Sequence, residues 1–187
     1  NQLEGICIRQ TPAADLNALA WGEATPVISR AQTAGLLLSD TAIARRRDGT
    51  WVLFVKGIDA SVNAGCSPGS LCELCARSIY QATSADLLHW SALTPVVTQA
   101  SVPDAVTYAD GTIWLYYQNF GPTCAAQDLR LAQRAPISGV AEQADGRFTA
   151  PVTVFFAGAS FETDPTEHYP TNANPVALPD AAAWAAY

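Results

Sequence analysis

The chain has 187 residues, 49% of them hydrophobic and 14% charged, so it can bury a core and provides material for one domain or two very small ones. A net charge of −7 excludes the basic face that binding to a nucleic-acid backbone requires. No stretch approaches the roughly 18 consecutive apolar residues of a membrane span.

A degenerate repeat begins near the start of the chain. The stretch 8–28 is echoed by the stretch 79–97: each has a short apolar strand ending in Gln, then Asp-Leu, a Trp and Thr-Pro-Val. Repeats at a period of some tens of residues are typical of solenoids and propellers. The repeat therefore decides the fold class.

Strand signals dominate the rest of the sequence. The stretches 48–57 and 110–119 both begin with Asp-Gly-Thr and continue as an aromatic strand, which indicates a hairpin turn followed by a strand. A strand that opens with Asp40, Asp104 or Asn174 precedes this turn or its degenerate form at 178–187. Third strands are expected at 77–84 and 129–135, and fourth strands at 25–28, 94–97 and 150–156.

This order of elements predicts an all-β fold, a β-propeller of four-stranded antiparallel blades. A β-sandwich also has many short strands, but it does not explain why the signals recur in one order. About three blades are expected: 1–30 as the outer half of a blade, 31–98 and 99–157 as full blades, and 158–187 as an inner half. We favour a chain that is part of a longer propeller; alternatively, a second chain supplies the missing blades.

The five cysteines predict disulfides in an exported protein, either secreted or periplasmic. Three of them crowd into the loop-like stretch 66–75. A metal knuckle at Cys72 and Cys75 would need a second ligand pair nearby, which the sequence lacks. The odd number leaves one thiol free or paired with another chain, and the spacing does not fix the pairing. The absence of Met and the start at Asn1 are typical of a processed chain or a fragment.

The turn at 84–90, Ser-x-Asp-Leu-x-x-Trp, and the stretch VPDAVTYADGTIWLYY at 102–117 resemble the five-bladed propellers of family 43 glycoside hydrolases and their relatives. Those enzymes cut arabinan, xylan or similar glycans, and related propellers act on fructans. The resemblance implies an oligo- or polysaccharide as the partner. It also implies inverting hydrolysis by paired carboxylic groups in the central channel.

The resemblance assigns roles to individual residues. Asp40 matches the base that activates water, and Asp104 matches the Asp that tunes pKa and position. Where the family has the acid, a Glu, this chain has Asn174, and an amide cannot donate the proton. Glu167 is the remaining candidate for the acid. Each Asp can alternatively cap backbone amides at a strand start, and Glu167 can be an exposed loop carboxylate.

Substrate-binding candidates are the aromatic and polar side chains expected at the channel, because sugars stack on aromatic rings. They are Tyr108, Tyr117, Phe120, His168, Tyr169 and Asn174. Trp51, Trp90 and Trp114, at fixed positions in the blades, are expected to pack between the sheets. No metal site and no cofactor are predicted, apart from a Ca²⁺ or Na⁺ ion in the channel.

We expect a secreted glycosidase of the inverting type. Two alternatives stay open: a non-catalytic, lectin-like propeller that binds carbohydrate, and a structural extracellular subunit. Asn174 favours the lectin-like reading, whereas the spacing of Asp104 from its hairpin turn favours the enzyme. The readings differ in whether Asp40 and Asp104 converge on one channel with a carboxylic acid opposite.

Overall fold

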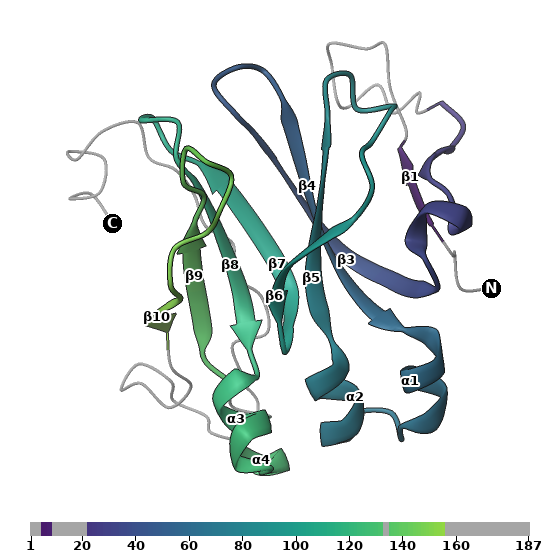
Figure 1. Ribbon diagram of the computed structural model, residues 1–187, viewed down its shortest axis with the longest axis vertical. Helices are drawn as coiled ribbons and strands as arrows, with labels where there is room; N and C mark the ends of the chain where they lie inside the picture. Colours follow the sequence, from purple (N-terminus) through teal and green to yellow (C-terminus); the bar gives the residue numbers. More distant parts are fainter. Residues whose placement is uncertain (1–4, 9–21, 133–134, 156–187) are drawn as a thin grey trace.

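The computed structural model describes residues 5–8, 22–132 and 135–155 (Figure 1). Its strands are β1 (Ile6–Ile8), β2 (Thr25–Ile28), β3 (Leu36–Arg45), β4 (Trp51–Asp59), β5 (Ser78–Ser84), β6 (Thr94–Thr98), β7 (Ala100–Thr107), β8 (Ile113–Asn119), β9 (Ile137–Ala141) and β10 (Val152–Phe155). Its helices are a 3-10 turn (η2, Arg30–Thr33), α1 (Ala60–Gly65), α2 (Leu71–Ala76), α3 (Gly121–Ala126) and α4 (Leu129–Ala132).

Two four-stranded antiparallel sheets make up most of the described chain. Their strand orders are β3-β4-β5-β6 and β7-β8-β9-β10, and β1 pairs with β2 in a separate two-stranded sheet. The fold is therefore all-β and propeller-like, as the repeat predicts. The four-stranded sheets lie within the predicted units 31–98 and 99–157, and the β1–β2 pair lies within 1–30. The unit predicted at 158–187 lies outside the described residues.

The Asp-Gly-Thr turns fold as the sequence indicates. In the first turn Gly49 has a φ of 91°, which a side chain would strain, and the Asp48 carboxylate accepts a hydrogen bond from the Thr50 amide at 2.9 Å. The turn at 110–112 repeats this geometry, with Gly111 at a φ of 87°. Each turn connects the first strand of a sheet to the second.

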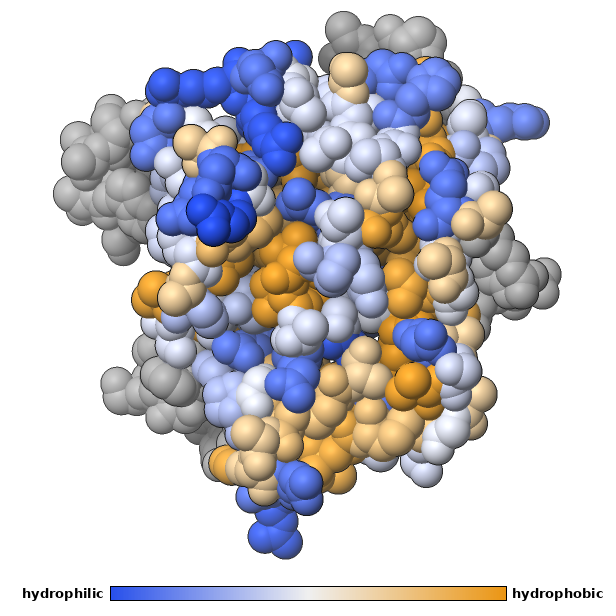
Figure 2. Space-filling view, viewed as in Figure 1, coloured by the Kyte–Doolittle hydropathy of each residue, from blue (hydrophilic) through white to orange (hydrophobic). Residues whose placement is uncertain are grey.

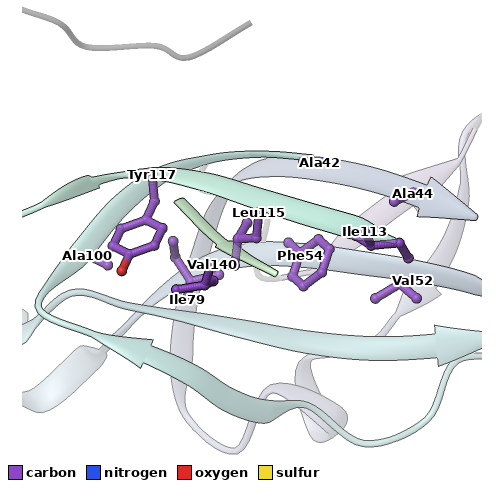
Figure 3. Packing of buried hydrophobic residues seen from close by; sticks show 10 residues of the cluster. All are labelled: Ala42, Ala44, Val52, Phe54, Ile79, Ala100, Ile113, Leu115, Tyr117 and Val140. Carbon is purple, nitrogen blue, oxygen red and sulfur yellow. The ribbon is translucent and has the colours of Figure 1, made fainter. Parts of the chain in front are cut away.

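The main hydrophobic core lies between the two four-stranded sheets, whose facing sides contribute side chains in alternation (Figure 3). Its buried members are Ala42, Ala44, Val52, Phe54, Ile79, Ala100, Ile113, Leu115, Tyr117 and Val140. A second cluster packs Val27, Ile28, Leu53, Ala82 and Trp90 between the first sheet and the β1–β2 pair. Each sheet is thus covered by its neighbour, as in successive blades of a propeller.

The first strands of the two four-stranded sheets, β3 and β7, run side by side. The Arg45 amide donates to the Thr107 hydroxyl at 3.2 Å, and that hydroxyl donates to the Arg45 carbonyl at 2.9 Å. Nearby, the Arg47 guanidinium donates to the Ala109 carbonyl at 3.1 Å. Adjacent first strands are the arrangement that places the inner strands of neighbouring blades around one axis.

The prediction of a strand at 129–135 is wrong. Residues 129–132 form α4, with the Asp128 carboxylate accepting from the Arg130 amide at 2.9 Å, and the third strand of the second sheet is β9 instead. Leu, Arg and Ala are good helix formers. Ala132 is buried beside Phe120 in a third cluster. Helix propensity and this packing outweigh the alternation that resembles a strand.

The stretch 66–75 is not only a loop, because it contains most of α2. The Ser70 hydroxyl caps this helix by accepting from the Glu73 amide at 3.4 Å. Helices α2, α3 and α4 lie together at one end of the two sheets (Figure 1).

The predicted disulfides are confirmed, and their pairing is now defined. Cys66 bonds to Cys72 within one connection, whereas Cys75 bonds to Cys124 and joins α2 of the first sheet to α3 of the second. Cys7 is free and exposed. The odd thiol is therefore the one on β1.

Candidate functional site

Asp40 lies on β3 at a β-bulge, between Ser39 and Thr41, where the pairing with β4 shifts register. Its φ is 46°, in the left-handed region, which is uncommon for a residue other than glycine and strained within a strand. The bulge turns the Asp40 carboxylate toward β4, where it forms an ion pair with the Lys56 ammonium. The Lys56 side chain is 17% exposed and that of Asp40 41%.

Strand β7 has the same distortion. Its pairing with β8 shifts register between Ser101 and Asp104, and Val102 has a φ of 50°, an unusual value for a β-branched residue. Val102 precedes the contact residue Thr107 by the same number of residues as Asp40 precedes Arg45. The structural equivalent of Asp40 on β7 is therefore Val102.

The sequence predicts that Asp40 and Asp104 occupy equivalent positions on their strands. In the structure they do not. Asp104 is level with Ala42, two residues further along. A stagger of two residues along a strand corresponds to about 6.6 Å. The two carboxyl groups belong to neighbouring first strands, and no hydrogen bond or ion pair links them among the residues described.

A chain of charged and polar side chains continues from Lys56 across the end of the first sheet. The Glu73 carboxylate forms an ion pair with Arg77, accepting from Nε at 3.0 Å and from Nη2 at 2.6 Å. Arg77 also approaches the buried Ser101 hydroxyl at 3.4 Å. Burial opposes ionisation of Glu73, but hydrogen bonds from Arg77 and the Gly69 amide, with the charges of Arg77 and Lys56, lower its pKa overall.

Lys56, Glu73 and Arg77 line a cleft of about 520 Å³, which we call the β3 cleft. It is lined by Gly5, Ile6, Cys7, Leu37, Leu38, Ser39, Thr41, Lys56, Ile58, Asn63, Glu73 and Arg77. Glu73 and two cations, Lys56 and Arg77, thus meet at a concave surface beside a strained strand, and Asp40 is connected to it through its ion pair with Lys56. Strained backbone and paired charges in a cleft are frequent at functional sites.

Asp104 has a different environment. Its side chain is half-buried, its carboxylate accepts only from the Ala105 amide at 2.8 Å among the described residues, and burial raises its pKa. It is paired across the ladder with Tyr116 of β8, whose hydroxyl lies 3.1 Å from that of Tyr108. The Tyr116 ring stacks on Trp114 at 6.1 Å between centroids. Asp104 therefore belongs to an aromatic face of the second sheet.

Two predicted substrate-binding rings are core residues. Tyr117 is 1% exposed and lies in the cluster between the sheets, and Phe120 is 2% exposed and lies in the cluster with Ala132 and Ala135. Neither ring is available to stack on a sugar. Tyr117 lies on the same face of β8 as Ile113 and Leu115, because the three residues are spaced two apart. The period of two along the strand therefore indicates that Tyr117 is buried.

The other predicted site residues, Glu167, His168, Tyr169 and Asn174, lie outside the described residues. Within the described ranges, no group of three or more His, Cys, Asp and Glu side chains could hold a metal ion. No helix there is long and apolar enough to cross a membrane.

Sequence reasoning missed Lys56, Glu73 and Arg77. A signal for Lys56 was present: it is the only lysine of the chain and interrupts the apolar run WVLFVKG. A charged residue in a buried strand needs a partner. Arg77 and Glu73 lie four residues apart, the spacing at which a helix brings two side chains together.

No protein-family model and no curated protein sequence matches the chain. Several solved structures are similar in shape. A Hadza microbial sialidase has a TM-score of 0.49 at 12% sequence identity, and the match covers 71% of this chain and 29% of the sialidase chain. A family 117 glycoside hydrolase from the marine bacterium Zobellia galactanivorans has a TM-score of 0.44 at 16% identity, over 82% of this chain and 43% of its own.

A B. subtilis levansucrase variant has a TM-score of 0.39 at 13% identity, over 83% of this chain and 34% of its own. The chain thus spans less than half the length of each of these three proteins. All three TM-scores are below 0.5.

Proposed function

We propose that this chain forms part of a carbohydrate-active enzyme that hydrolyses glycosidic bonds, with Asp40 as the general base. The observation that carries the proposal is the placement of Asp40: it lies on a first strand, at a strained bulge, and is paired with the ammonium of Lys56, which lines the β3 cleft together with Ser39 and Thr41. Backbone strain of this kind costs about 1–3 kcal/mol, persists only where the surrounding structure enforces it, and is frequent at active sites.

Asp104 is proposed as a positioning residue on the neighbouring strand. Burial raises the pKa of Asp104, so its carboxyl group holds a proton more readily than an exposed one does. The two-residue stagger of about 6.6 Å separates Asp40 from Asp104 along two neighbouring first strands. In this proposal Asp104 orients the sugar or the attacking water beside Asp40.

The proton donor is the part of the mechanism that the described residues do not supply. Inverting hydrolysis needs a carboxylic acid that protonates the leaving oxygen while the base activates water on the opposite face of the sugar ring. We retain Glu167, which lies outside the described residues, as the candidate acid. The substrate class proposed is a neutral glycan such as arabinan or xylan, which the family 43 resemblance favours, with Tyr108 as an aromatic contact.

The test is hydrolysis of arabinan, xylan and the p-nitrophenyl glycosides of arabinofuranose and xylose by the wild-type protein and by Asp40→Asn. Asn tolerates the left-handed backbone well, so this change removes the base and preserves the bulge. We expect turnover to fall by about 10²–10⁴-fold. Asp48→Asn, a change of the same type in an exposed turn, is the matched control and should retain activity.

Equal turnover by Asp40→Asn and the wild-type protein would contradict the assignment of the base. Oligosaccharide binding without hydrolysis by the wild-type protein would favour the lectin-like alternative.

A further inference from the structure

A second cleft, of about 560 Å³, opens between the two four-stranded sheets, and we call it the inter-sheet cleft. Strands β5 and β6 supply one side and β8, β9 and the turn after β9 supply the other. Its lining residues are Gln81, Thr94, Pro95, Val96, Val97, Thr98, Tyr117, Val140, Gly146, Arg147, Phe148, Thr149 and Pro151. Figure 2 shows hydrophobic surface near the centre of this face, between the sheets, with hydrophilic residues around it.

Two buried polar atoms at this cleft have no hydrogen-bond partner among the described residues: Gln81 Oε1 and the Tyr117 hydroxyl. Buried polar groups in folded proteins are almost always paired, so such a pair on one cleft calls for an explanation. Tyr117 is 1% exposed, and its ring extends from β8 into the space between the sheets beside Ala100 (Figure 3). Both residues line the same cleft, so a molecule bound there can supply partners for both groups.

The two atoms differ in what they need. Gln81 Oε1 can only accept a hydrogen bond. Burial raises the pKa of Tyr117 to about 12, so its hydroxyl stays protonated at neutral pH and can donate. A matching ligand must therefore present both a donor and an acceptor, as a hydroxyl-bearing molecule does.

The rest of the lining favours a neutral molecule with an apolar side. Val96, Val97 and Phe148 are partly buried apolar residues that can contact C–H groups. Arg147 is the one charged side chain in the lining, and it is already paired with Asp145 at 2.6 Å. No unpaired charge is thus offered to an anion or a cation by the lining residues.

We propose that the inter-sheet cleft binds a neutral polyol of monosaccharide size, held by Gln81 and Tyr117. The cleft volume lies within the range of about 300–1,000 Å³ typical of small-molecule sites. No residue of β3 or β7 lines it, so the cleft is separate from Asp40 and Asp104. The inference does not depend on the proposed hydrolytic activity.

The test uses D-xylose, L-arabinose, D-galactose and glycerol as probes, with saturation-transfer NMR and thermal unfolding of the full chain. We expect at least one sugar to bind and, at ten times its Kd, to raise the midpoint of unfolding by about 3–6 °C. Tyr117→Phe removes only the hydroxyl and should weaken that affinity at least tenfold. Tyr80→Phe is the matched control: Tyr80 does not line the cleft, its ring lies against Gly57 of β4, and the change should leave binding unaltered.

Gln81→Met removes the acceptor, keeps the length of the side chain, and provides a second test should Tyr117→Phe fail to fold. The proposal is overturned if no probe binds at about 100 mM, a hundredfold above a Kd of 1 mM, because the two polar groups then serve water alone. It is equally overturned if Tyr117→Phe and Gln81→Met bind as tightly as the wild-type protein.

Discussion

The Cys75–Cys124 disulfide should be the strongest single covalent contribution to the stability of the described fold. It closes a loop of 49 residues, whereas Cys66–Cys72 closes one of 6. A disulfide stabilises chiefly by restricting the unfolded chain, and the effect grows with the logarithm of loop length. The relation gives about 4 kcal/mol for the long loop and about 2 kcal/mol for the short one.

The perturbation is two double variants, Cys75→Ser/Cys124→Ser and Cys66→Ser/Cys72→Ser. Replacing both partners leaves no new thiol that could exchange with the free Cys7. Urea unfolding followed by tryptophan fluorescence gives the free energy of unfolding of each protein. Midpoints of thermal unfolding should fall by about 8–16 °C for the long-loop variant and by about 4–8 °C for the short-loop one.

The order of the two effects is the sensitive part of this prediction. Only the long-loop disulfide connects the first four-stranded sheet to the second, through α2 and α3. Equal losses in the two variants, or a larger loss in the short-loop variant, would refute the reasoning from loop closure.

Three further predictions concern single side chains. Asp104→Asn should stabilise the protein at pH 7 but not at pH 3, as measured by the midpoints of urea unfolding. Burial raises the pKa of Asp104 in the folded protein above the ordinary 3.8. The protonated Asp104 side chain therefore contributes its full stability below pH 3.8, and this contribution is lost as the pH rises through the raised pKa. Glu73→Gln should destabilise most at neutral pH, because the lowered pKa of Glu73 gives stability that is present above the ordinary 4.5 and lost as pH falls; equal losses at pH 7 and pH 3 would contradict this. Phe54→Ala should cost about 3–5 kcal/mol in urea unfolding, because it empties the core between the sheets, whereas Ile43→Ala on the exposed face should cost less than about 1 kcal/mol.

The sheets were predictable because local signals and packing agree there. The Asp-Gly-Thr turns set the hairpins, and the alternation of Val52 and Phe54 on one face with Leu53 and Val55 on the other marks β4 as a strand covered on both sides. The repeat then orders the strands into two similar sheets. Turn chemistry and periodicity are properties of neighbouring residues, so one sequence suffices to read them.

The candidate site was predictable only in part because its geometry depends on register. The bulges at Asp40 and Val102 shift the pairing register of β3 with β4 and of β7 with β8, and no local sequence pattern predicts these bulges. The spacing to the hairpin turn is eight residues for Asp40 and six for Asp104, and this difference of two equals the stagger between the two residues in the structure. The ion pair between Asp40 and Lys56 could not be predicted from local sequence, because the two residues are brought together only by the pairing of β3 with β4.

The most direct measurement is a titration of the isotope-labelled protein with arabinotriose and xylotriose, followed by backbone amide NMR. We predict that one trisaccharide shifts the amides of Asp40, Thr41, Asp104 and Ala105 together, because the proposed function places the glycan beside the adjacent first strands β3 and β7. Shifts confined to other strands, or no shift with either trisaccharide, would contradict the assignment of Asp40 and Asp104 to a common glycan site.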